Sequence, residues 1–142
     1  FIKKIKNLLK PEGMFALTVP NIGGFEYLAL GMDHGNVMPP AHLNYFNIES
    51  ITKLLNASGF KVDSIETPGL LDIQNIYQHL VNNPGYKFCV DKNPFASKEV
   101  RTMAEILLEI INSCKDIDQN KIQSILREHM MSGHLRIIAS NK

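Results

Sequence analysis

Residues 8–21 read Leu-Leu-Lys-Pro-Glu-Gly-Met-Phe-Ala-Leu-Thr-Val-Pro-Asn, and this stretch joins the end of an amphipathic helix to an apolar strand through one tight turn. Before it, the apolar residues of the first nine positions share one helical face and the lysines lie on the other. Pro11 and Gly13 end this helix. The run Met14–Val19 is typical of a strand covered on both faces. The sequence therefore predicts an α/β domain, and because no capping residue precedes Phe1, we expect its first strands to be missing.

Composition narrows the class of protein. A chain of 142 residues with 44% hydrophobic residues has the size and composition of one compact domain. Its formal net charge of +1 gives no general attraction to nucleic acid or membrane, so we expect neither as a partner, and the lysines of the first helix are interpreted as a solvated face. Cys89 and Cys114 show no metal-ligand spacing and are predicted to be reduced thiols in a cytoplasmic protein.

A long loop rich in glycine and proline, residues 20–46, follows the first strand, with room for a short helix between Phe25 and Met32. Open α/β sheets bind ligands at the carboxyl ends of their strands. This loop is therefore the first candidate for a functional site.

The remaining chain alternates helix and strand signals. Asn47 is predicted to cap a helix that ends at Gly59, and residues 60–67 and 134–140 are predicted strands. Between these strands the apolar periodicity is helical, which predicts a helical insertion. We accordingly divide one domain into a helix-strand-loop-helix-strand segment, a helical cap insertion and a last strand, at residues 1–69, 70–131 and 132–142.

Several motifs together resemble the carboxyl-terminal half of class I S-adenosylmethionine-dependent methyltransferases. The resemblance runs from the first residue to about Pro68 and resumes near Met131. The motifs that carry it are Leu9-Lys10-Pro11-Glu12-Gly13 before a strand ending Val19-Pro20-Asn21, His42-Leu43-Asn44-Tyr45-Phe46, Ala57-Ser58-Gly59-Phe60, and Ser132-Gly133-His134 before a strand ending Ala139-Ser140-Asn141-Lys142.

The resemblance implies the C-terminal part of a Rossmann-like fold, with a three-stranded mixed sheet. In such a sheet the last strand, residues 136–140, lies antiparallel between strands 14–19 and 61–67. The first of these strands then has one unpaired edge, and we expect the chain to self-associate along it as a homodimer or to exchange elements with a second copy.

The sequence departs from the family in the cofactor half. It lacks the Gly-rich turn and the acidic residue with which the family holds its cofactor, and Gly23-Gly24 has the wrong spacing to replace that turn. S-adenosylmethionine is thus implied as the cofactor of the intact enzyme, whereas this chain alone is expected to bind it poorly or not at all. Its cofactor-binding residues are unknown.

His42 is the candidate catalytic residue, because the resemblance places its loop over the acceptor pocket and an imidazole suits a general base at neutral pH. The alternative is a histidine that fixes the loop to the following helix by hydrogen bonding. Residues expected at the same pocket, as contacts for a small-molecule acceptor, are Pro20, Asn21, Asn44, Tyr45 and His134. Asp33 and His34 with His42 lack a spacing that would converge on a metal, and no metal site is predicted.

Two functions remain open. The first is the acceptor-side half of a small-molecule methyltransferase, inactive in isolation. The second is a non-catalytic binding or assembly module that uses its helical cap and its open strand edge.

Overall fold

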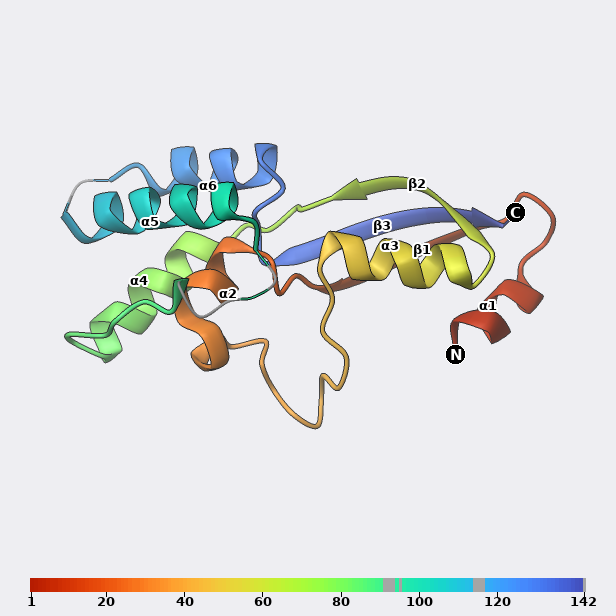
Figure 1. The fold of residues 1–142 in the computed structure, drawn as a ribbon, viewed down its shortest axis with the longest axis horizontal. Coiled ribbons are helices and arrows are strands. Elements are labelled where there is room, and N and C mark those ends of the chain that lie inside the picture. Colours follow the sequence, from red (N-terminus) through yellow and green to blue (C-terminus); the bar gives the residue numbers. More distant parts are fainter. Residues whose placement is uncertain (91–93, 95, 114–116, 142) are drawn as a thin grey trace.

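The chain folds into a sheet region and a helical region that lie end to end (Figure 1). This computed structural model describes residues 1–90, 94, 96–113 and 117–141. The strands are β1 (Met14–Pro20), β2 (Phe60–Glu66) and β3 (His134–Asn141). The helices are α1 (Ile2–Leu8), α2 (Phe25–Leu30), the 3-10 helix η1 (Gly31–Asp33), α3 (Ile48–Ala57), α4 (Asp72–Asn82), α5 (Lys98–Ser113) and α6 (Gln119–Glu128). Both termini lie at the end of the sheet that is far from the helical region (Figure 1).

The sheet has the order β1-β3-β2, and β3 runs antiparallel to both of its neighbours. The prediction that the last strand lies between the other two is therefore confirmed. The predicted mixed sheet is wrong, since every hydrogen-bonded pair of strands is antiparallel. β1 and β2 are parallel to each other, but β3 separates them.

In the part of the chain that the structure describes, one face of the sheet is covered and the other is not. Phe60, Leu135 and Ile137 pack with α3 residues Ile51 and Leu55 into a core on the covered face. On the opposite face alternate residues of β1 are exposed, and Met14 keeps 72% of its surface. The prediction that this strand is covered on both faces is wrong, because an apolar run reports the character of the side chains and not the presence of a second layer.

The helical region has a separate apolar core formed by α2, α4, α5 and α6. The apolar residues of the predicted helical periodicity supply this core, since Ile76, Leu107 and Leu126 are all buried. Residues 86–89 are neither helix nor strand, and the Cys89 N–H donates to the Ala29 carbonyl.

α3 begins after its predicted cap, Asn47. The Asn47 side chain accepts from the Ser50 N–H, and the Ser50 hydroxyl accepts from the Asn47 N–H, which makes a reciprocal cap for α3. The Asp118 side chain caps α6 by accepting from the N–H groups of Asn120 and Lys121. Gly59, with φ of +85°, follows α3, where the sequence places the end of that helix.

Among the described residues no helix is long and apolar enough to cross a bilayer. Cys89 is a free thiol, and Cys114 lies outside the described residues.

Candidate functional site

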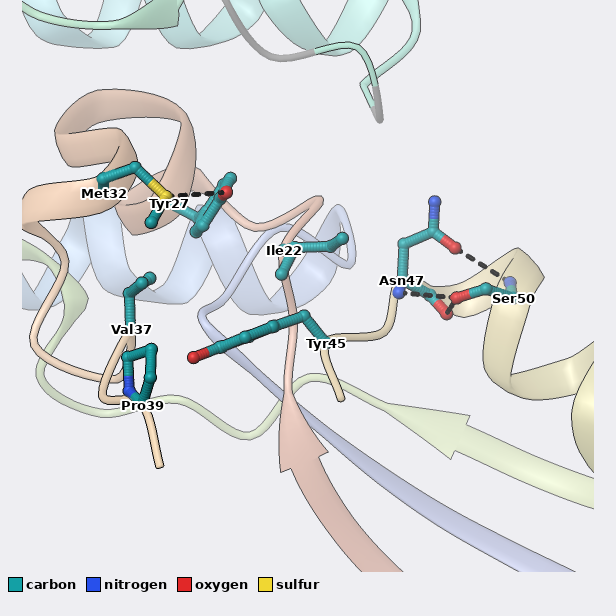
Figure 2. Close-up of a pocket in the computed structure, with 8 residues that line it drawn as sticks. All are labelled: Ile22, Tyr27, Met32, Val37, Pro39, Tyr45, Asn47 and Ser50. Atoms are coloured by element: carbon teal, nitrogen blue, oxygen red, sulfur yellow. Dashed lines mark hydrogen bonds between the residues drawn. The ribbon is translucent and has the colours of Figure 1, made fainter. Parts of the chain in front are cut away.

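An apolar pocket of about 390 Å³ lies beyond the carboxyl end of β1 (Figure 2). It is formed where the chain leaves the strand, turns through α2 and η1, and returns along residues 34–46 to the start of α3. The residues that line it are Ile22, Tyr27, Met32, Val37, Pro39, Tyr45, Asn47 and Ser50. The pocket therefore lies in the loop region that the sequence singles out.

The walls of the apolar pocket carry no charged side chain among the residues that line it. At one end Asn47 and Ser50 hydrogen-bond to each other in the cap of α3. At the other end the Tyr45 hydroxyl points toward Pro39 and, within the described structure, has no hydrogen-bond partner although it is shielded from solvent (Figure 2). A pocket of this size and polarity suits a small uncharged ligand that offers Tyr45 one polar atom.

The structure brings only one of the predicted site residues, Tyr45, into this pocket. Asn44, the preceding residue, lines a different groove beside β1. His42 is half-buried in the same loop, with its backbone N–H donating to the Met38 carbonyl, and lies outside the pocket lining. Its role as a general base stays a prediction.

Asn21, Pro20 and His134, which are also predicted site residues, make contacts within the fold. Asn21 is 3% exposed and donates its amide to the Ser132 carbonyl, while its side-chain oxygen accepts from the Gly23 N–H. Pro20 and His134 face each other as the terminal pair of β1 and β3.

The sequence missed a buried polar cluster that joins the sheet to the helices, which we call the polar junction. It consists of Asn21, Glu26, Asp72, Gln123 and the turn Ser132–Gly133, all of it buried. The Asp72 carboxylate accepts from the Gly133 N–H and from the Gln123 amide. Gln123 also donates to the Gly69 carbonyl at 3.0 Å and accepts from the Ile73 N–H.

Burial dominates the electrostatics of this junction. It raises the pKa of Asp72 above the usual value, while the hydrogen bonds from Gln123 and Gly133 oppose that rise and the neighbouring Glu26 carboxylate adds to it. The Asp72 carboxyl therefore connects α4 to α6 and to the turn before β3, and its removal from water costs free energy.

A second carboxylate in the polar junction pairs with the loop. Glu26 accepts from the Asn75 amide at 2.9 Å and lies 3.2 Å from Nε2 of His34, without the alignment of a hydrogen bond. Nδ1 of His34 accepts from the Asn36 N–H, which fixes the ring within the loop. His34 is 4% exposed and thus anchors the loop from within.

Tyr86 ties η1 to the segment after α4. Its hydroxyl lies 3.0 Å from both the Leu30 carbonyl and the Asp33 carboxylate. Burial, followed by the neighbouring Cys89 and Asp33, raises the pKa of this phenol. Tyr86 therefore stays protonated as a donor.

Neither a metal nor a nucleotide-like cofactor finds a fitting set of groups at the apolar pocket. Within the described part of the chain no three His, Cys, Asp or Glu side chains cluster as metal ligands. A Cβ on Gly24 would lie 2.7 Å from the Ser132 carbonyl oxygen. The missing side chain of Gly24 therefore allows close approach of the Ser132 backbone of the same chain, and not of a cofactor. No carboxylate among the pocket-lining residues is available for ribose hydroxyls.

Comparison with known proteins adds no family: no family model matches the sequence, and no curated protein matches it significantly. The function is therefore argued from the geometry.

Proposed function

We propose that this chain supplies the acceptor-binding half of an S-adenosylmethionine-dependent methyltransferase that acts on a small, uncharged, largely apolar molecule. The observation that carries the proposal is the apolar pocket over the carboxyl end of β1. This is the edge of an α/β sheet at which ligands are usually bound.

The strand arrangement supports the same proposal. A last strand that runs antiparallel between two earlier strands is the arrangement implied by the resemblance of the sequence motifs. Fold alone does not assign chemistry, so the proposal depends on the pocket and on the residues that line it.

In this proposal the pocket positions the acceptor molecule and excludes water from it. Tyr27 and Met32 form one apolar wall, and Tyr45 forms the opposite wall and offers its hydroxyl to a polar atom of the acceptor. Holding an acceptor in one orientation accelerates a transfer reaction without any further chemistry from the protein. His42 enters as a general base only if the loop that carries it turns toward the acceptor.

The residues present do not fit the methyl donor. The proposal therefore requires that S-adenosylmethionine be held by another part of the protein or by another chain, and we derive no step through it. Calorimetry of this chain with S-adenosylhomocysteine is expected to show no binding.

The first test is binding of an uncharged aromatic probe, 2-naphthol, to this chain, followed by NMR. We expect saturable shifts at Tyr27, Met32 and Tyr45. Met32→Asp, which places a charge at the pocket wall, should weaken binding on the order of tenfold, equivalent to about 1.4 kcal/mol. Met38→Asp is the matched control, since Met38 is an exposed methionine of the same loop outside the pocket lining, and it should leave binding unchanged.

The second test concerns the reaction. The gene product that contains this chain, together with any donor-binding part, should transfer a labelled methyl group to a neutral acceptor, and Met32→Asp should raise KM for the acceptor and not for the donor. Transfer that is insensitive to Met32→Asp would contradict the pocket assignment, and absence of methyl transfer would contradict the activity.

The open edge of β1 favours a second function, that of an assembly module, because it offers unpaired backbone groups to another strand.

A further inference from the structure

Among the residues that the structure describes, β1 has a row of backbone groups without a partner strand. The Asn21 N–H donates to the Gly133 carbonyl, and the Asn141 N–H donates to the Gly13 carbonyl. In an antiparallel ladder alternate residues bond to the same neighbour, so the odd-numbered residues of β1 bond to β3. The N–H and C=O groups of the even-numbered residues Met14, Ala16 and Thr18 therefore point away from the sheet.

An apolar groove runs beside this edge between α1 and α3. It measures about 600 Å³, and its floor includes β1 side chains that are only half-buried. Its lining comprises Phe1, Ile2, Lys3, Phe15, Leu17, Thr18, Val19, Asn44, Phe46, Ile51, Leu54 and Ser58. Free backbone groups beside apolar side chains are the two features that a docking strand requires.

The opposite edge of the same sheet is protected. β2 carries Lys61, Asp63 and Glu66, and its ladder is interrupted by a bulge between Val62 and Ser64. Charges and bulges are the usual means by which edge strands avoid pairing with other chains. β1 has no charged residue from Met14 to Pro20, so of the two edges only β1 is open to pairing.

The available part of β1 is bounded at both ends. Glu12, with φ of +61°, turns the chain out of the strand before Met14. At the other end Pro20 has no N–H, and Phe46 lies against the next residues, its carbonyl accepting from the Ile22 N–H. The free ladder is thus centred on Ala16.

We propose that β1 pairs antiparallel with β1 of a second copy of this chain, about a two-fold axis at Ala16. Met14 then faces Thr18 of the second copy, and Glu12 of each copy lies opposite Pro20 of the other. The free backbone groups of the two copies therefore end at matching positions. A second copy fits because the existing sheet is antiparallel throughout, and the pair continues that pattern as one sheet across both copies.

The side chains agree with this register. Phe15 comes opposite Leu17 of the second copy on the groove face, where both are half-buried in the single chain. Ala16 meets Ala16 of the other copy on the uncovered face, where a small side chain allows close approach. The pairing therefore buries apolar surface that the single chain leaves in contact with solvent.

Charge substitution at Ala16 tests both the interface and its register. Ala16 is exposed on the uncovered face, so Ala16→Glu and Ala16→Lys are tolerated by the single chain. Each variant places two like charges opposite each other in the dimer. In sedimentation velocity over a dilution series we expect the unsubstituted chain to dimerise and each variant to associate at least about tenfold more weakly.

An equal mixture of Ala16→Glu and Ala16→Lys should restore the dimer, because opposite charges then face each other. Thr18→Glu, a charge at a position that faces Met14 and not itself, should weaken association less than Ala16→Glu. An unsubstituted chain that stays monomeric at every concentration would overturn the proposal. So would a mixture that associates no better than either variant alone, since the two Ala16 residues would then not face each other. Neither result depends on methyl transfer.

Discussion

The sheet region and the helical region differ in how completely they cover their apolar side chains and pair their backbone groups. The helical region has an apolar core among α2, α4, α5 and α6, and the side chains of the polar junction are hydrogen-bonded to one another and to the turn before β3. The sheet region covers one face with α3, leaves the other face exposed and leaves β1 with a free edge. The comparison indicates that surface available for binding is found along β1 and at its carboxyl end.

The largest effect is expected from truncation in either core. Leu135 of β3 and Leu126 of α6 are both fully buried, one in each region. Leu135→Ala and Leu126→Ala should each lower the free energy of unfolding by about 2–5 kcal/mol, through lost burial and the cavity left behind. Because the polar junction ties the regions together, urea unfolding followed by circular dichroism should remain one transition in both variants. A second, separate transition would show that the two regions unfold independently.

A smaller effect is expected where the regions meet. Gly24→Ala would place a Cβ 2.7 Å from the Ser132 carbonyl oxygen, a backbone atom that cannot move aside cheaply. We expect a loss of about 1–3 kcal/mol, typical of overpacking. Gly35→Ala is the matched control, because nothing lies within 4 Å of its Cβ position, and it should change stability by less than about 0.5 kcal/mol. Equal effects at both glycines would argue against the close packing of the junction.

The smallest effect is a pH dependence from Asp72, whose pKa burial raises above 3.8. A raised pKa means that the folded protein binds this proton more tightly than the unfolded chain. The resulting stabilisation is fully present below the unfolded-state pKa and is lost as pH rises through the folded-state pKa. Asp72→Asn removes this titration, so the unfolding free energy of the unsubstituted chain minus that of the variant should fall from acid to neutral pH. A difference that rises with pH would contradict the desolvation of Asp72.

Local signals in the sequence predict much of this fold. Asn47 and Gly59 mark the two ends of α3, and the apolar stripes identify the buried faces of α4 to α6. The loop that contains the apolar pocket follows from its glycines, its prolines and its place after a strand. These features depend on residues close together in the chain, where propensity and spacing are informative.

The remaining features depend on distant partners. Asp72 looks like an exposed residue at the start of a helix, and only Gln123 and Gly133, more than fifty positions away, explain its burial. The contact of the Asn21 amide with the Ser132 carbonyl likewise joins residues far apart in the chain and could not be read from local sequence. The apolar run of β1 could not reveal that one face lacks a covering layer, because that depends on what packs against it.

The free edge of β1 is the feature on which the account most depends, and hydrogen exchange of its amides at low protein concentration tests it directly. The account predicts fast exchange at Ala16 and Thr18, whose N–H groups point to solvent, and slow exchange at Leu17 and Val19, which bond to β3. Raising the concentration should then slow Ala16 and Thr18. Equal protection of all four amides in dilute solution would contradict an open edge.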